Sequence, residues 1–110
     1  MQAKDFAGQD LTGRDFSHED LQGADFTKAV LRGARFRGAN LRGACLHGVD
    51  ARDADFTEAD LTGADLSEGD FRGARFARAV LAETLRQGAR FDKWALKKAW
   101  LTGPPSALVD

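Results

Sequence analysis

The chain has 110 residues and a formal net charge of −1, a length that suits one domain at most. Lys and Arg number 16 against 17 Asp and Glu, so no overall field favours nucleic acid or an anionic membrane. No segment approaches the ~20 consecutive apolar residues of a transmembrane helix, and the first ten residues lack the apolar stretch of a signal peptide. A single cysteine, Cys45, excludes an internal disulfide. We therefore expect a soluble cytoplasmic protein.

Apolar residues recur every five residues along most of the chain. All eight phenylalanines fall in one register of this period, together with leucines, and from residue 24 onward a small residue, mostly Ala, stands two residues before most of them. A glycine often stands two residues after. An α-helix would space apolar residues by about 3.6, whereas a spacing of two is that of a strand. The phenylalanines are Phe6, Phe16, Phe26, Phe36, Phe56, Phe71, Phe76 and Phe91.

A second period of 20 residues predicts how these short units stack. Steps of 20 from Phe16 reach Phe36, Phe56 and Phe76, and steps of 20 from Leu21 reach Leu41, Leu61 and Leu81. We expect each five-residue unit to be a short extended stretch followed by a corner, with four units in one coil. Because a single unit is too short to bury its apolar side chains, the coils must stack on one another.

The repeated units resemble those of the pentapeptide-repeat family, whose motif is A(D/N)Lxx. Units such as ADFTK (24–28), ANLRG (39–43) and ADLTG (59–63) carry the resemblance. It implies an all-β fold, a right-handed quadrilateral β-helix of about four to five coils over residues 1–91. With coils ~4.8 Å apart, residues 4–91 would build a prism about 21 Å tall.

Departures from the motif mark the two ends of the predicted prism. In the first coil, the small inward position holds the polar residues Lys4, Gln9, Arg14 and Glu19. Burying such groups without partners is costly, so we expect this end to be open to water. Ala51 replaces a large residue and predicts slack that Phe71 of the next coil fills. In 82–88 the large residue arrives one position early, which predicts that the coil loosens or ends there.

The C-terminal segment has the signals of a short helix. Asp92 suits a first turn, Lys97 and Lys98 suit later turns, and Gly103 followed by two prolines would end it. We therefore predict a capping helix over 92–103 that covers the last coil, and a tail over 104–110. The apolar residues of this region also predict homodimerisation. The cap or dimer contacts expected are Trp94, Leu96, Trp100, Leu101 and Leu108.

Outward charges alternate in sign along the third side of each coil. Asp15, Arg35, Asp55 and Arg75 lie 20 residues apart, so neighbouring coils would neutralise one another. This third face is also the most basic one and could meet an acidic partner surface. Its possible interaction residues are Arg35, Arg37, Arg75 and Arg78.

The sequence contains no pattern of a catalytic or metal site. No Gly-x-Ser-x-Gly motif surrounds a serine, and Cys45 with His47 would leave a metal two ligands short. The glycines stand singly at corners rather than in a phosphate-binding loop. We therefore expect no enzyme activity, no cofactor and no metal.

The function expected from these features is a protein–protein interaction or scaffolding module with an unknown partner, without direct binding to nucleic acid or membrane. Some relatives in the family protect DNA gyrase by imitating DNA, which implies an alternative role against a type II topoisomerase. A mimic of this height would need about 12 negative charges, whereas the net charge is −1. A purely structural, self-assembling protein is the second alternative.

Overall fold

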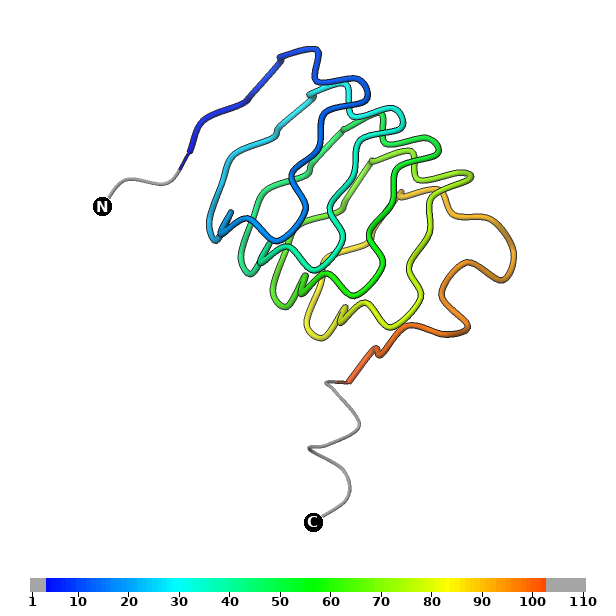
Figure 1. Ribbon diagram of the computed structural model, residues 1–110. Helices are drawn as coiled ribbons and strands as arrows, with labels where there is room; N and C mark the ends of the chain where they lie inside the picture. Colours follow the sequence, from blue (N-terminus) through cyan, green and yellow to red (C-terminus); the bar gives the residue numbers. More distant parts are fainter. Residues whose placement is uncertain (1–3, 103–110) are drawn as a thin grey trace.

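Residues 4–102 of the chain, which the computed structural model describes, coil into a stack of similar turns (Figure 1). Between these bounds there is neither an α-helix nor a continuous strand. Single bridge residues alternate instead with two-residue turns, and one such unit takes five residues. Nothing in residues 4–102 is a helix long and apolar enough to cross a membrane.

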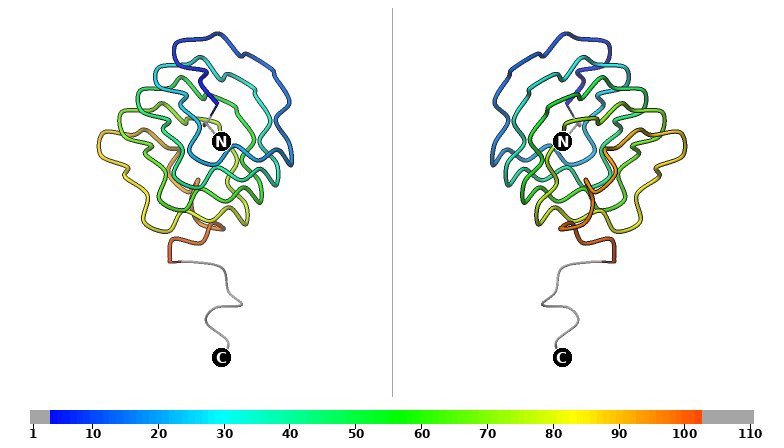
Figure 2. Two further views of the ribbon diagram at one scale, coloured as in Figure 1. Left: turned by 90° about the vertical axis from the view of Figure 1, so that its left-hand side faces the viewer. Right: turned by 90° about the vertical axis from the view of Figure 1, so that its right-hand side faces the viewer.

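Parallel β-bridges join residues 20 positions apart and define four faces of the stack. The first face begins with the bridge from Asp5 to Asp25, and the second with the bridge from Asp10 to Val30. The third begins with Asp15 and Arg35, and the fourth with Asp20 and Asn40. The predicted β-helix and its 20-residue period are thus confirmed. Figure 2 shows the successive coils from two opposite sides.

Each bridge joins two neighbouring coils through a pair of backbone hydrogen bonds. Val30 N–H donates to the Gln9 carbonyl at 2.9 Å, while its own carbonyl accepts from Leu11 N–H at 2.7 Å. A third bond closes the corner, from Arg14 N–H to the Leu11 carbonyl at 3.0 Å. The backbone polar groups are therefore satisfied between coils, as in a parallel sheet, although no unit is long enough to be a strand.

The interior holds the large and small apolar residues of the five-residue repeat, as predicted. Phe36 is fully buried and stacks face to face on Phe16 and Phe56, with ring centroids 5.0 Å apart in both pairs. Phe76 continues the column, 5.2 Å from Phe56. Rings stack here because identical side chains lie one coil apart. The coil spacing therefore decides which residue packs on which.

The corners require a left-handed backbone, which explains the glycine register. Every resolved corner glycine has a positive φ, for example 71° at Gly63. Non-glycine residues take the same conformation elsewhere, with φ of 62° at Asp53 and 58° at Arg78. Glycine adopts this region without steric cost, so it is frequent at the corner without being obligatory.

The N-terminal end of the stack is open to solvent, as expected from its polar residues. Lys4, Gln9 and Arg14 are exposed where later coils bury alanine. Lys4 Nζ lies 3.5 Å from Glu19 Oε1, and the Arg14 guanidinium lies 5.1 Å from the centre of the Phe16 ring. The Arg14 side chain therefore lies over the Phe16 ring, and it remains exposed to solvent.

The C-terminal capping helix predicted over 92–103 is not formed in residues 92–102. Residues 93–98 make consecutive turns closed by i to i+3 bonds, such as Ala95 N–H to the Asp92 carbonyl at 3.0 Å. The chain then returns to the stack, where Trp100 bridges Val80 on the fourth face. In Figure 1 this excursion is the orange loop that leaves the stack.

The predicted helix does not form because β-bridges between residues 20 positions apart continue into this segment. Leu85 and Arg90 still bridge Asp65 and Asp70. Of the two predicted outcomes for 82–88, loosening or ending of the coil, the ending is therefore wrong. Trp100 N–H donates to the Ala79 carbonyl at 2.8 Å, and its own carbonyl accepts from Leu81 at 2.7 Å. An isolated helix of about ten residues is marginal in water, and these pairings to the previous coil replace it. The predicted tail, 104–110, lies outside the described residues.

Candidate interaction surface

The outward aspartates of the repeat hold the corners of the coils. Asp55 Oδ1 accepts the N–H of Thr57 at 2.9 Å and its hydroxyl at 2.5 Å. Asp65 binds Ser67 in the same way, at 2.9 and 2.5 Å. A short acidic side chain that bonds the backbone two residues later is a common way to fix a turn. These carboxylates therefore fix the turns at the corners of the coils.

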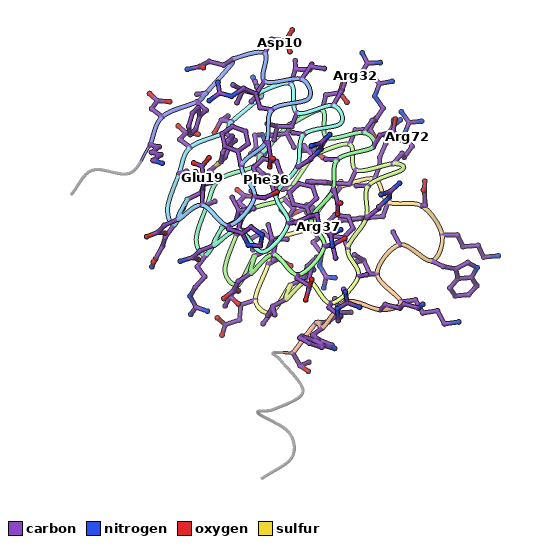
Figure 3. All side chains as sticks on the ribbon, in the orientation of Figure 1. Asp10, Glu19, Arg32, Phe36, Arg37 and Arg72 are labelled. Carbon is purple, nitrogen blue, oxygen red and sulfur yellow. The ribbon has the colours of Figure 1, made fainter. Side chains whose placement is uncertain are left out.

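Arginine side chains form ion pairs with the outward aspartates in two ways, either between neighbouring coils or within one corner. On the third and fourth faces the pairs join one coil to the next, with Arg37 3.2 Å from Asp55 and Arg42 3.0 Å from Asp60. On the second face Arg52 and Arg72 pair with an aspartate of their own corner, while Arg32 lies 3.9 Å from Asp50 of the next coil. Arg72 binds Asp70 through two bonds, of 2.9 and 2.6 Å. Figure 3 shows Asp10, Arg32 and Arg72 along this edge of the stack.

These contacts lower the pKa of the carboxyl groups. The hydrogen bond from the Arg72 side chain is the main reason that the pKa of Asp70 falls from 3.8 to about 2. Burial alone would raise the pKa of Asp55, but the bonds from Thr57 and Arg37 outweigh it and the pKa lies below its ordinary value. The carboxylates are thus held in their charged form, which suits a fixed ladder of charge rather than proton transfer.

Two arginines of the third face form no ion pair within residues 4–102. Of the four cations predicted for this face, Arg37 pairs with Asp55 and Arg78 lies 3.6 Å from Glu58. Arg35 and Arg75 are exposed and appear in no ion pair between described residues. All four project from the same face, and the positive charge available to a partner comes from Arg35 and Arg75.

A shallow pocket of about 310 Å³ opens at the end of the third face. Its floor is the last regular unit of that face, 74–77, and its wall is the excursion, which contributes Trp94 and Ala95. Arg75, Lys97 and Lys98 supply positive charge at the same place. Apolar side chains and three cations therefore meet where the last coil leaves the stack. The sequence predicts Arg75 as an interaction residue but does not predict the pocket, because the helix predicted over 92–103 would cover this end of the stack.

The comparison with family models agrees with this architecture. The model described as pentapeptide repeats matches the chain with eight copies, over residues 5–34, 20–58 and 59–93. The chain belongs to the pentapeptide repeat family. The resemblance noted in its units is thereby confirmed.

Solved structures of the family share the fold of this pentapeptide repeat protein. One, from the thylakoid lumen of Arabidopsis thaliana, is 39% identical with a TM-score of 0.71, and covers 76% of this chain and 62% of that one. The present chain therefore spans about three fifths of the length of that relative. Another, from the cyanobacterium Nostoc, is 30% identical with a TM-score of 0.53, covering 90% of this chain and 85% of that one. No curated protein matches the chain.

The residues predicted as cap or dimer contacts of this repeat protein lie in different environments. Trp94 is 70% exposed and Leu101 43% exposed. Leu96 and Trp100 are partly buried, and Leu96 packs against the core. Leu108 lies outside the described residues.

Cys45 and His47 lie on the first face and contact different partners. Cys45 Sγ is 3.1 Å from the Thr27 hydroxyl, and His47 Nδ1 is 2.9 Å from the Ser67 hydroxyl. Within residues 4–102 no group of three or more His, Cys, Asp or Glu side chains is placed to hold a metal ion. Each of the two residues is part of a local contact between coils.

Proposed function

We propose that this protein is a non-enzymatic protein-binding or scaffolding module that uses its third face to bind an acidic surface of a partner protein. The observation that carries the proposal is the pair of exposed, unpaired guanidinium groups, Arg35 and Arg75, two coils apart on one face. Other outward arginines, such as Arg52 and Arg72, are neutralised by an aspartate of their own corner. The core behind the face is stacked phenylalanine, so the spacing of the two arginines is fixed.

A binding role also suits the rest of the surface. The outward carboxylates take part in turn hydrogen bonds and ion pairs. The faces are flat, and we propose no catalytic role for their side chains. A rigid surface binds with little loss of conformational entropy. Electrostatic complementarity then contributes mainly to the choice of partner and the rate of association.

The test is affinity capture from a lysate of the organism that encodes the protein, at low and moderate salt, followed by mass spectrometry. The variant Arg35→Gln/Arg75→Gln should lose a partner that the native protein retains. The matched control is Arg32→Gln/Arg72→Gln, which removes the same charge from the second face and should keep that partner. Equal capture by the native protein and the third-face variant would contradict the proposed surface.

The identity of what is captured separates the remaining alternatives. A type II topoisomerase as the retained partner would favour the alternative role as its protector or inhibitor, which a supercoiling assay then checks directly. Recovery of this protein alone would favour a purely structural, self-assembling role. A net charge of −1 supports neither nucleic acid nor an anionic membrane as the direct partner.

A further inference from the structure

The third face ends in an open β-edge at the floor of the pocket. The bridge between Asp55 and Arg75, the last one on the third face, shows the regular pattern. There Arg75 N–H donates to the Ala54 carbonyl at 3.0 Å, and Phe56 N–H donates to the Arg75 carbonyl at 2.8 Å. The next unit should repeat this pattern with residue 95, but Ala95 N–H donates to the Asp92 carbonyl instead. Among the described residues, the Ala74 carbonyl and the Phe76 N–H consequently have no hydrogen-bond partner.

This edge is the only break in the bridge columns between the last two coils. Leu85, Arg90 and Trp100 continue the first, second and fourth faces, while the third column stops at Arg75 within residues 4–102. Ala74 and Phe76 are 8% and 1% exposed, yet both line the pocket. A backbone donor and acceptor without a hydrogen-bond partner cost free energy, which a bound strand would recover.

We propose that the pocket binds an extended acidic peptide segment of a partner protein, which adds to the open edge as the missing third-face unit. This rests on the proposed function and names the chemistry of its partner. One residue of the peptide donates its N–H to the Ala74 carbonyl and accepts the Phe76 N–H, as Arg75 does one coil earlier. Addition of a strand to an exposed sheet edge is a general mode of peptide recognition.

The charges around the edge select an acidic residue at that position. The third column reads Asp15, Arg35, Asp55, Arg75, so a carboxylate beside Arg75 continues the alternation of sign. Lys97 and Lys98 line the same pocket and would repel a basic peptide. The exposed ring of Trp94 forms an apolar wall. A volume of about 310 Å³ suits a few residues of a chain rather than a folded surface.

The test uses the full chain and the acetylated, amidated peptide ADATE, titrated by NMR. Binding should shift the Phe76 amide resonance and slow its hydrogen exchange, while the already paired Phe56 amide stays unchanged. The peptide ANATE, which lacks only the Asp carboxylate, and the variant Arg75→Gln should each weaken binding about tenfold, the loss expected for one charged hydrogen bond. Arg35→Gln, on the same face but beside a fully paired edge, should bind as the native protein does.

Backbone methylation of the peptide separates strand addition from simple charge attraction. Methylating the Asp nitrogen removes the bond to the Ala74 carbonyl and should abolish binding. Methylating the nitrogen of the following Ala, which faces away from the edge in an extended peptide, should leave binding intact. Equal binding of both methylated peptides, or equal effects of the Arg35 and Arg75 variants, would overturn the proposal.

The exchange rate of the free protein provides a further check. The Phe76 amide should exchange much faster than the Phe56 amide when no peptide is present. Protection of Phe76 in the free protein would mean that another segment or a second copy of this chain already pairs with the edge, which would also overturn the proposal. Failure of the peptide leaves the capture test of the third face unaffected, so the two failures are distinguishable.

Discussion

The ring of Phe71 occupies the space in the core that a side chain on Gly69 would need. A Cβ added to Gly69 would lie 2.5 Å from Cε2 and 2.9 Å from Cζ of the Phe71 ring. Gly69 stands at the small inward position that alanine fills in most other units. Phe71 is fully buried and lies in the same column as Ala51, one coil later. The glycine therefore makes room for a large ring at a position where the previous coils carry leucine or alanine.

Gly69→Ala should lower the free energy of unfolding by about 1–3 kcal/mol, because the added methyl group overpacks the buried ring. Pairing it with Phe71→Leu should make the methyl group much less costly, because the two sites are in contact. Urea denaturation of the two single variants and the double variant measures this coupling. Strictly additive effects would contradict a steric overlap between the added methyl group and the Phe71 ring.

The phenylalanine column predicts a gradient of stability along the stack. Phe56→Ala should lower the free energy of unfolding by about 3–5 kcal/mol, the usual cost of removing a buried ring, since Phe56 stacks on Phe36 and Phe76. Phe6→Ala, at the open end where the ring is only partly buried, should cost roughly half as much or less. Both are measured by urea denaturation. Equal losses would mean that the open end is as tightly packed as the middle.

The ion pair between Asp70 and Arg72 predicts a loss of stability in acid. The pKa of Asp70 is about 2 in the folded protein and 3.8 ordinarily, so the unfolded chain binds the proton more readily. The stabilisation is therefore complete above pH 3.8 and is lost as the pH falls through about 2. Arg72→Gln should raise the pKa of Asp70 and shift this loss to higher pH. Carboxyl NMR titration and acid unfolding measure both effects.

Arg42→Gln is the matched control for the acid prediction. Arg42 pairs with Asp60 on the fourth face, away from Asp70, so its removal should leave the titration of Asp70 unchanged. An equal shift in the Arg42 and Arg72 variants would show that net charge, rather than the direct bonds of Arg72, sets the pKa of Asp70. Because both arginines are half exposed, added salt should weaken both pairs.

The fold could be predicted from the sequence because the strongest pattern in it, the 20-residue period, corresponds to the step from one coil to the next. A residue such as Phe36 contacts its equivalents 20 residues away, so the columns can be found by counting. The helix over 92–103 was predicted wrongly because Asp92, Lys97 and Gly103 satisfy local helix rules that ignore the earlier coil. The return of Trp100 to the Val80 bridge depends on that coil. The pocket beside Arg75 exists only because of this return, and no local pattern marks it.

Self-association through the C-terminal segment remains a prediction. Trp94 and Leu101 are two of the three large hydrophobic residues exposed in residues 4–102, and Leu85 is the third. If the C-terminal segment forms the dimer, Trp94→Ser/Leu101→Ser should reduce the mass found by light scattering from twice 11.9 kDa to 11.9 kDa. The control is Leu85→Ser, which removes an equally exposed side chain from the first face and should keep the dimer. A native protein that stays monomeric at all concentrations, or a double variant of unchanged mass, would contradict this contact.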